Sequence, residues 1–355
     1  MIDALRSALS GQHRCWADLP IEPLPDKGLA HLHLRIQGSG VLARIPKQSQ
    51  MCLPAAEHLA YEAACFDRAA LSGYTPQLHG VLPPSATLPR GALLVQEIVG
   101  RPLRLPQDLP ALVRTLAALH ALPLPPVRDR APLLDPGDPL AALLAEIDYQ
   151  ARHLDAALLS PQVRDAIEAE LLALRALVET AARPPKQLIS FDAHPGNFIV
   201  DAQGRAMLVD LEKARYGAAP LDLAHATLYT STTWDVASSA TLTLGQVAQA
   251  YADWSGLIHN APAQRPWLVP LRRAMWLWSI TWCAKWRALA MQGSRGGNGG
   301  RDRGAGGGED WSTELSDPAL VAHVRERVDH YLSPSAVMWV RDEASALQRE
   351  FAAAG

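Results

Sequence analysis

Short apolar runs separated by turns mark the first hundred residues. Residues 32–36 carry leucine or isoleucine at every second position, and Gly38-Ser39-Gly40 separates them from a second apolar run at residues 41–45. A period of two around a glycine turn predicts a β-hairpin. Apolar residues then recur at steps of three and four over residues 54–72, which predicts a helix. Two further strands are expected, at residues 77–82 and 92–99.

Helical spacing dominates from Gly100 onwards. The first of these segments opens with Asp108 as a candidate cap and has Pro110 in its first turn, a combination typical of a helix start. The predicted helices cover residues 108–122, 139–153, 161–182, 236–253, 266–291, 317–332 and 335–353.

This order of elements predicts an α+β fold, with a small β-rich lobe followed by a larger, mainly helical lobe. We expect a lead-in with a short helical start at residues 1–26, the β-rich lobe at 27–100 and the helical lobe at 101–355. Residues 293–308 contain nine glycines in sixteen positions. Such a segment cannot bury enough apolar surface to order itself, so we interpret it as a flexible surface loop, with a functional lid as the alternative.

The composition argues against several classes of protein. Hydrophobic residues make up 48% and charged residues 19% of the 355 positions, as in a soluble globular protein. The net charge of −3 gives no basic excess to neutralise phosphates, which argues against a nucleic-acid partner. No apolar run approaches the roughly 20 residues of a membrane span, and four scattered cysteines indicate neither a zinc site nor a disulfide framework. We expect a cytoplasmic protein that acts on small molecules, away from membranes.

The stretch best suited to chemistry contains a second predicted hairpin, over residues 198–209. Two apolar runs are joined there by a turn of ordinary length. Pairing Asp201 with Ala206 places Asn197 opposite Asp210, and directly opposed residues lie about 4.5–5.5 Å apart. An amide oxygen and a carboxylate at this spacing suit a hard cation such as Mg²⁺.

Asp192 lies five residues before Asn197, on the loop that enters this hairpin. A carboxylate followed by an amide and then by a metal-binding carboxylate is the arrangement of kinase-type phosphoryl transfer. Several motifs resemble those of the aminoglycoside phosphotransferase and choline kinase-like family: Asp192-Ala193-His194-Pro195-Gly196-Asn197, Leu208-Val209-Asp210-Leu211-Glu212, Asp222-Leu223-Ala224 and the helix ending Leu119-His120. The resemblance implies a two-lobed, protein kinase-like fold.

The family resemblance also implies an enzyme that uses ATP and Mg²⁺ to phosphorylate a hydroxyl group of a small molecule. Asp192 is then the catalytic residue, which accepts or orients the proton of the acceptor hydroxyl. Asn197 and Asp210 are the implied Mg²⁺ ligands. Asp222 is the implied structural residue, which accepts backbone N–H bonds from the catalytic loop. The motifs identify neither the acceptor, nor a choice between ATP and GTP, nor the oligomeric state.

In the β-rich lobe the resemblance implies a cation that binds the nucleotide phosphates. Arg44, on the second strand of the first hairpin, takes this role, with Lys47 as the alternative; an Arg fork suits phosphate oxygens. Glu62 is the expected ion-pair partner on the following helix, and Glu57 is the competing choice.

The same resemblance places the adenine contact at the backbone of Glu97 and Val99, where the chain passes from one lobe to the other. Lys27-Gly28 stands where a glycine-rich phosphate loop is expected, but a single glycine is weak support. The chain has no Walker A sequence, which argues against a P-loop kinase.

Ser190-Phe191 departs from the family pattern, which usually has His-Gly before the catalytic Asp. The missing His normally supports the backbone of the catalytic loop, so the departure favours a second hypothesis, a nucleotide-binding pseudokinase-like module without turnover. His194 raises a third, because Asp-x-His also begins the metal site of many metallophosphoesterases. His225 and His259 stand alone in the sequence, whereas such sites need clusters of ligands.

The segment predicted as a helix at residues 266–291 carries a stripe of large apolar side chains. Most stripes of this kind belong to the core. An aromatic wall that binds a cationic acceptor, such as a quaternary ammonium group, is the alternative. The stripe consists of Leu271, Met275, Trp278, Trp282 and Trp286, with Trp276 beside it.

Overall fold

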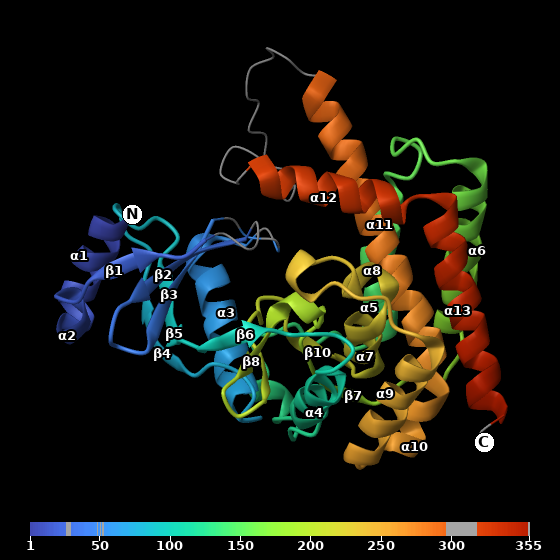
Figure 1. Cartoon of the computed structure of the whole chain (residues 1–355), viewed down its shortest axis with the longest axis horizontal. Coiled ribbons are helices and arrows are strands. Elements are labelled where there is room, and N and C mark those ends of the chain that lie inside the picture. Colours follow the sequence, from blue (N-terminus) through green and yellow to red (C-terminus); the bar gives the residue numbers. More distant parts are fainter. Residues whose placement is uncertain (26–29, 48, 50, 52, 296–317, 354–355) are drawn as a thin grey trace.

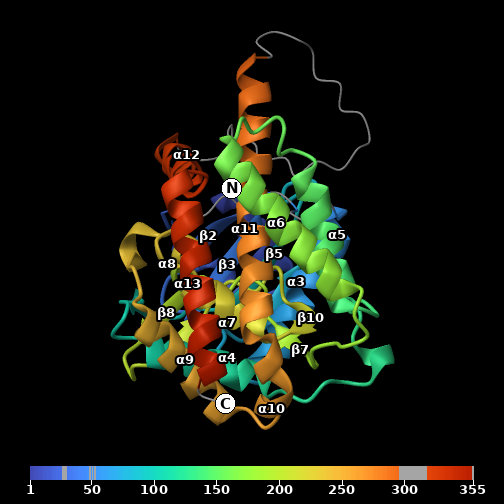
Figure 2. The same cartoon turned by 90° about the vertical axis from the view of Figure 1, so that its right-hand side faces the viewer.

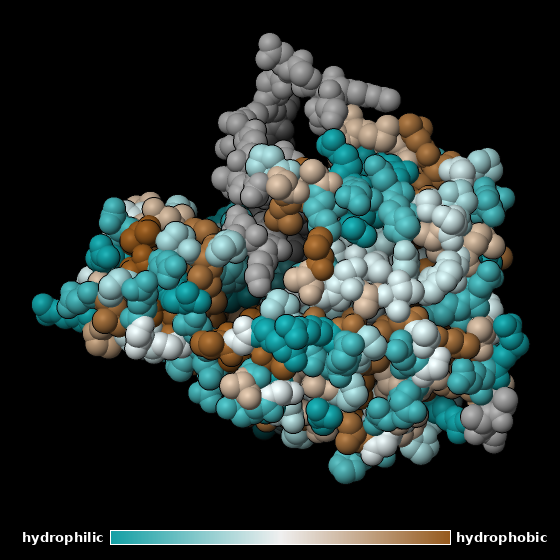
Figure 3. Space-filling view, in the orientation of Figure 1, coloured by the Kyte–Doolittle hydropathy of each residue, from teal (hydrophilic) through white to brown (hydrophobic). Residues whose placement is uncertain are grey.

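The computed structural model describes residues 1–25, 30–47, 49, 51, 53–295 and 318–353. Within these residues the chain forms a smaller lobe built on a β-sheet and a larger lobe built from helices (Figure 1). The predicted α+β architecture is confirmed. On the face in Figure 3, hydrophilic residues are interspersed with hydrophobic ones over both lobes.

A five-stranded antiparallel sheet forms the smaller lobe, and the first predicted hairpin lies at its centre. In spatial order the strands are β1 (Ile21–Pro23), β2 (His31–Ile36), β3 (Val41–Pro46), β5 (Ala92–Gln96) and β4 (Leu78–Leu82). Side chains alternate between the two faces, as the strand period requires. Leu93 and Val95 pack towards helix α3 (Ala55–Ala70), whereas Ala92 and Leu94 pack towards helix α1 (Ile2–Gln12).

Residues 1–25 are more ordered than a simple lead-in. The predicted helical start is present as α1 and α2 (Arg14–Ala17), and Leu5 and Leu9 of α1 are fully buried against the sheet. Strand β1 adds to the edge of the sheet beside β2. Its three residues lie among prolines, so the sequence carries no strand period there.

Helix α11 runs through the larger lobe and packs against α5, α6, α7, α12 and α13. Figure 2 shows α11 between α6 and α13. The longer helices of this lobe are α4 (Leu109–His120), α5 (Pro139–Ala151), α6 (Pro161–Val178), α7 (Pro220–Thr227), α9 (Leu244–Leu257), α11 (Leu268–Arg295), α12 (Pro318–Tyr331) and α13 (Pro334–Ala353). Short helical turns are α8 (Tyr229–Thr232), α10 (Ala261–Gln264), η1 (Val127–Asp129), η2 (Pro195–Asn197), η3 (Val236–Ser238) and η4 (Arg265–Trp267).

Two small antiparallel sheets lie between the main sheet and these helices. One has the order β6-β8-β9 and the other pairs β10 with β7. A Cβ on Gly100 would lie 2.3 Å from the carbonyl oxygen of Val200, so only glycine allows the chain to cross here so close to β8. The strands are β6 (Gly100–Pro102), β7 (Lys186–Ile189), β8 (Phe198–Asp201), β9 (Ala206–Leu208) and β10 (Arg215–Ala218).

Two helix predictions differ from the structure in their boundaries. The segment predicted as one helix over residues 236–253 begins with η3, and α9 starts only at Leu244, because Thr243 and Gln246 form a capping box at that point. Helix α11 continues to Arg295, into the predicted glycine-rich loop; the rest of that loop lies outside the described residues, as does Lys27-Gly28. No helix in the described ranges is long and apolar enough to cross a membrane.

Candidate active site

The loop that carries Asp192, the predicted catalytic residue, is held in place by one buried carboxylate. Asp222, on α7, accepts the backbone N–H of Ser190 (2.7 Å) and of Phe191 (2.8 Å). His120, at the end of α4, lies 3.1 Å from the same carboxylate, and Trp254 donates to His120 (3.0 Å). Asp222 and Trp254 are fully buried. The predicted structural role of Asp222 is therefore confirmed.

Phe191 shows how the loop accommodates its departure from the family pattern. Its backbone has φ of 58°, the left-handed region that favours glycine. Its ring is 2% exposed, meets Trp278 edge-on (ring centroids 5.3 Å apart) and lies under the guanidinium of Arg215 (3.8 Å). The hydroxyl of Ser190 accepts the N–H of Asp192 (3.2 Å). Packing and a serine turn thus hold the loop.

Asp192 projects from this loop towards cationic and imidazole groups. Lys213 Nζ lies 2.8 Å from Asp192 Oδ2, and His225 Nδ1 lies 3.8 Å from Oδ1. Burial opposes ionisation of Asp192, but Lys213, His194 and His225 outweigh it and lower its pKa. Burial also lowers the pKa of His225 to about 4, so its imidazole is neutral at pH 7. The lowered pKa favours the ionised carboxylate, which is the form that can accept a proton.

The predicted second hairpin exists, but its predicted register is wrong by one residue. Val200 pairs with Ala206, and the N–H of Val209 donates to the carbonyl of Asn197 (2.9 Å), so Asn197 opposes Val209 and not Asp210. The cause is a three-residue loop in which Gly204 has φ of 75° and the Asp201 carboxylate accepts the N–H of Arg205 (2.9 Å). A glycine at this loop position is typical of a bulged turn.

Candidate metal ligands gather where β9 ends. A ligand atom from each of His31, Asp210 and Glu212 lies within 4.8 Å of the others. Burial and the neighbouring Asp210 raise the pKa of Glu212 to about 7, as expected where two carboxylates share a buried position that suits a cation. Asn197, the other predicted ligand, donates its amide to the carbonyl of Asp192 (2.9 Å). The oxygen ligands fit a hard cation such as Mg²⁺.

Glu212 and His31 were not predicted as ligands. Glu212 follows Asp210 at a spacing of two, which is the signal in the sequence that places both carboxylates on one side of an extended chain. His31 comes from the other lobe, 179 positions away from Asp210, and no local pattern connects them.

Arg44 links the two lobes. Its guanidinium donates to Asp210 Oδ1 (2.9 Å) and to the carbonyl of Val209 (3.2 Å). Between Arg44 and Glu62, both described in full, no direct ion pair forms, which corrects the predicted partnership. His31 lies between them, with Nε2 2.7 Å from Glu62 and Nδ1 3.3 Å from Arg44. A chain of polar contacts thus runs from Glu62 on α3 through His31 and Arg44 to Asp210.

A model of the phosphotransferase enzyme family matches residues 33–258, a span that contains Arg44, Asp192, Asp210 and Glu212 but begins after His31. The chain belongs to the phosphotransferase enzyme family. No protein of curated function matches its sequence. The family, the kinase-like fold and the class of enzyme, a small-molecule kinase, agree with the sequence-based prediction.

Solved structures share the fold of this phosphotransferase at low identity. A choline/ethanolamine kinase family protein from Mesorhizobium loti is 19% identical, with a TM-score of 0.60 over 98% of this chain and 100% of that one. Aminoglycoside 2'-phosphotransferase-IIIa, solved with GDP, is 15% identical, with a TM-score of 0.57 over 92% and 98%. An ethanolamine kinase from Plasmodium vivax is 10% identical, with a TM-score of 0.59 over 95% and 88%.

The predicted adenine contacts lie where the phosphotransferase chain passes between its lobes. Glu97 follows β5; its N–H donates to the carbonyl of Gly40 (2.8 Å) and its carboxylate pairs with Arg35 (2.6 Å). Val99 is 76% exposed. The role of Glu97 and Val99 in binding the base stays a prediction.

The histidines beside Asp192 do not build the two-metal centre of a phosphoesterase. The rings of His194 and His225 lie 6.1 Å apart, and Nδ1 of His194 accepts the N–H of Gly196 (3.2 Å). Among the described residues, the group of three His, Cys, Asp or Glu side chains close enough to share an ion is the one at His31. Neither His194 nor His225 belongs to it.

The aromatic stripe of α11 is divided between core and site. Met275, Trp276 and Trp286 are buried in the hydrophobic core of the larger lobe. Trp278 borders the catalytic loop, and the ammonium of Lys213 lies 5.9 Å from the centre of its ring. Trp278 thus packs against Phe191, in the loop that carries Asp192.

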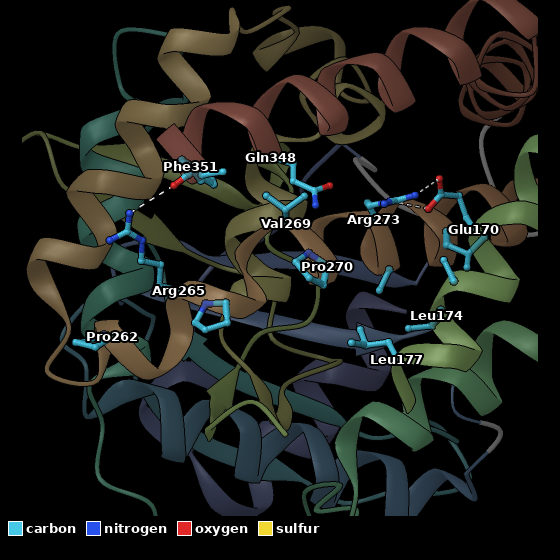
Figure 4. A pocket seen from close by; sticks show the side chains of 15 residues that line it. Glu170, Leu174, Leu177, Pro262, Arg265, Val269, Pro270, Arg273, Gln348 and Phe351 are labelled. Atoms are coloured by element: carbon cyan, nitrogen blue, oxygen red, sulfur yellow. Dashed lines mark hydrogen bonds and ion pairs between the residues drawn. The ribbon is translucent and has the colours of Figure 1, made fainter. Parts of the chain in front are cut away.

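A separate cavity of about 570 Å³ lies between α6, α11 and α13. Figure 4 shows Arg273 paired with Glu170 at one side of it and Arg265 bonded to the carbonyl of Phe351 at the other. None of its lining residues belongs to the catalytic loop or the metal cluster. The cavity is therefore distinct from the candidate active site.

Proposed function

We propose that this phosphotransferase transfers the γ-phosphoryl group of ATP, in a Mg²⁺-dependent reaction, to a hydroxyl group of a small molecule. The observation that carries the proposal is the arrangement of two groups of acidic side chains, Asp192 on one side and Asp210 with Glu212 on the other. Asp192 lies on the loop whose backbone Asp222 holds and is paired with Lys213, and Lys213 directly follows the candidate metal ligand Glu212. This arrangement supports the proposal, because phosphoryl transfer requires a proton acceptor near a bound cation.

In the proposed reaction Asp192 accepts or orients the proton of the acceptor hydroxyl. The oxygen forms a bond to the γ-phosphorus, the bond between that phosphorus and the β–γ bridging oxygen breaks, and ADP leaves. Asp210 and Glu212, with Asn197, would hold Mg²⁺, which neutralises charge on the β- and γ-phosphates when bound. Arg44 would donate to the phosphate oxygens. Positioning and charge neutralisation supply most of the acceleration.

A coupled ADP-release screen of hydroxylated metabolites and aminoglycosides tests the proposal, with Asp192→Asn as the matched control. We expect Mg²⁺-dependent ADP release with one class of acceptor, and loss of that release in the variant. Nucleotide binding without Mg²⁺-dependent turnover would favour the pseudokinase-like module that the Ser190-Phe191 departure suggests. Absence of nucleotide binding would reject both.

A further inference from the structure

The ammonium group of Lys213 lies at a carboxylate and an aromatic ring, the two kinds of group that bind organic cations in proteins. Its ammonium donates to the Asp192 carboxylate (2.8 Å) and lies 5.9 Å from the centre of the Trp278 ring. The side chain is 17% exposed. An aromatic face next to a carboxylate is the usual binding site for an ammonium ligand. In this chain both elements are already occupied by a side chain of the protein.

Arg215 repeats the arrangement two residues further on. Its guanidinium is paired with Glu146, the carboxylate that also accepts the indole N–H of Trp278 (3.3 Å). Arg215 also covers the ring of Phe191. The carboxylates of Asp192 and Glu146 are therefore each paired with a cation from the same short segment of chain.

We propose that the acceptor carries no cationic group beside its reacting hydroxyl, and that Lys213 is the residue that enforces this. The acceptor is then a neutral or anionic alcohol. The inference rests on the proposed function, since it takes Asp192 as the group that meets the hydroxyl. An ammonium two carbons from that hydroxyl would need the position of Lys213, and moving Lys213 would leave a partly buried ammonium without its carboxylate.

Another carboxylate beside the loop that carries Asp192 belongs to Asp235. A Cβ on Gly196, in the catalytic loop, would lie 2.7 Å from Asp235 Oδ2, while Oδ1 accepts the N–H of Ala237. Asp235 is therefore the alternative recognition group for a cationic acceptor, and it enters the test as its own variant.

Pairs of alcohols that differ in charge but little in shape test the proposal. Choline is matched with 3,3-dimethylbutan-1-ol, and ethanolamine with ethylene glycol and glycolate. Binding to the full chain, loaded with Mg²⁺ and a non-hydrolysable ATP analogue, is measured by ligand-observed NMR, alongside kcat/KM from ADP release. We expect the neutral member to be favoured over the ammonium member by about tenfold or more.

Two substitutions separate charge from structure. Lys213→Met keeps the length of the side chain and is expected to bring the two members of each pair within about threefold. Lys213→Arg keeps the charge and the preference. The proposal is overturned if the unmodified protein binds the ammonium member as tightly as the neutral member, or more tightly. It is also overturned if Lys213→Met leaves the ratio between the two members unchanged. A preference for the ammonium member that is lost in Asp235→Asn would assign recognition to Asp235 instead. Failure to bind the nucleotide analogue rejects the proposed function instead.

Discussion

Phe191 carries a prediction in which two opposing effects can be weighed. Its backbone lies in the left-handed region at φ of 58°, which costs a residue with a Cβ about 1 kcal/mol or more relative to glycine. Its ring is buried between Trp278 and Arg215, and loss of a buried phenylalanine ring costs about 3–5 kcal/mol. The packing therefore outweighs the strain.

Two variants separate these effects. Phe191→Ala loses the ring and keeps the backbone strain, so the free energy of unfolding should fall by about 3–5 kcal/mol. Phe191→Gly loses the same ring but relieves the strain, so it should be more stable than Phe191→Ala by about 1 kcal/mol. At an ordinary position the order is reversed, because glycine adds entropy to the unfolded chain.

Urea denaturation of the three proteins, monitored by far-ultraviolet circular dichroism, measures the order. The comparison requires that the unfolding free energy of all three proteins depends on urea concentration with the same slope. If Phe191→Gly is less stable than Phe191→Ala, the backbone argument is refuted. If the free energy of unfolding falls by less than about 1 kcal/mol in both variants, the packing argument is refuted.

Three further predictions concern the loop, the metal and the pH profile. Asp222→Asn turns one acceptor into a donor facing Ser190, so urea denaturation should show a loss of about 2–4 kcal/mol in the free energy of unfolding; a loss within experimental error would contradict the bracing role. Glu212→Gln should raise the Mg²⁺ concentration for half-maximal ADP release about tenfold while nucleotide binding without metal stays unchanged, and an unaltered Mg²⁺ dependence would remove Glu212 from the ligand set. Lys213 lowers the pKa of Asp192 against the effect of burial, so the Asp192 carboxylate stays ionised at pH values below the usual pKa of an aspartate. Lys213→Met should raise the pKa of Asp192 and move the acid limb of the kcat/KM profile to higher pH. An acid limb that does not move would contradict the pairing of Lys213 with Asp192.

Local patterns in the sequence encode part of the candidate site. Asp192, Asn197 and Asp210 lie within one short segment, where strand period and loop spacing act directly. The register error shows the limit of this reasoning, because Gly204 at a left-handed position shortens the loop by one residue. A rule for bulged turns would have corrected it.

The rest of the site depends on contacts that no local pattern records. His31 and Glu62 meet across 31 residues, and Arg44 meets Asp210 across 166. Strands β7 and β10 have four residues each and pair only with one another, so tertiary packing rather than propensity decides that they form. Lys213 was unremarkable in sequence because its partner Asp192 lies 21 residues away.

Asp192→Asn gives the most direct test of the central claim, that this carboxylate meets the acceptor hydroxyl. The substitution keeps the shape of the side chain and removes its ability to accept a proton. Calorimetric titration with Mg-ATP and single-turnover phosphoryl transfer are measured on the same preparation. We predict a dissociation constant within about threefold of that of the unmodified protein and a transfer rate lower by about 10²-fold or more. An undiminished transfer rate would contradict the account.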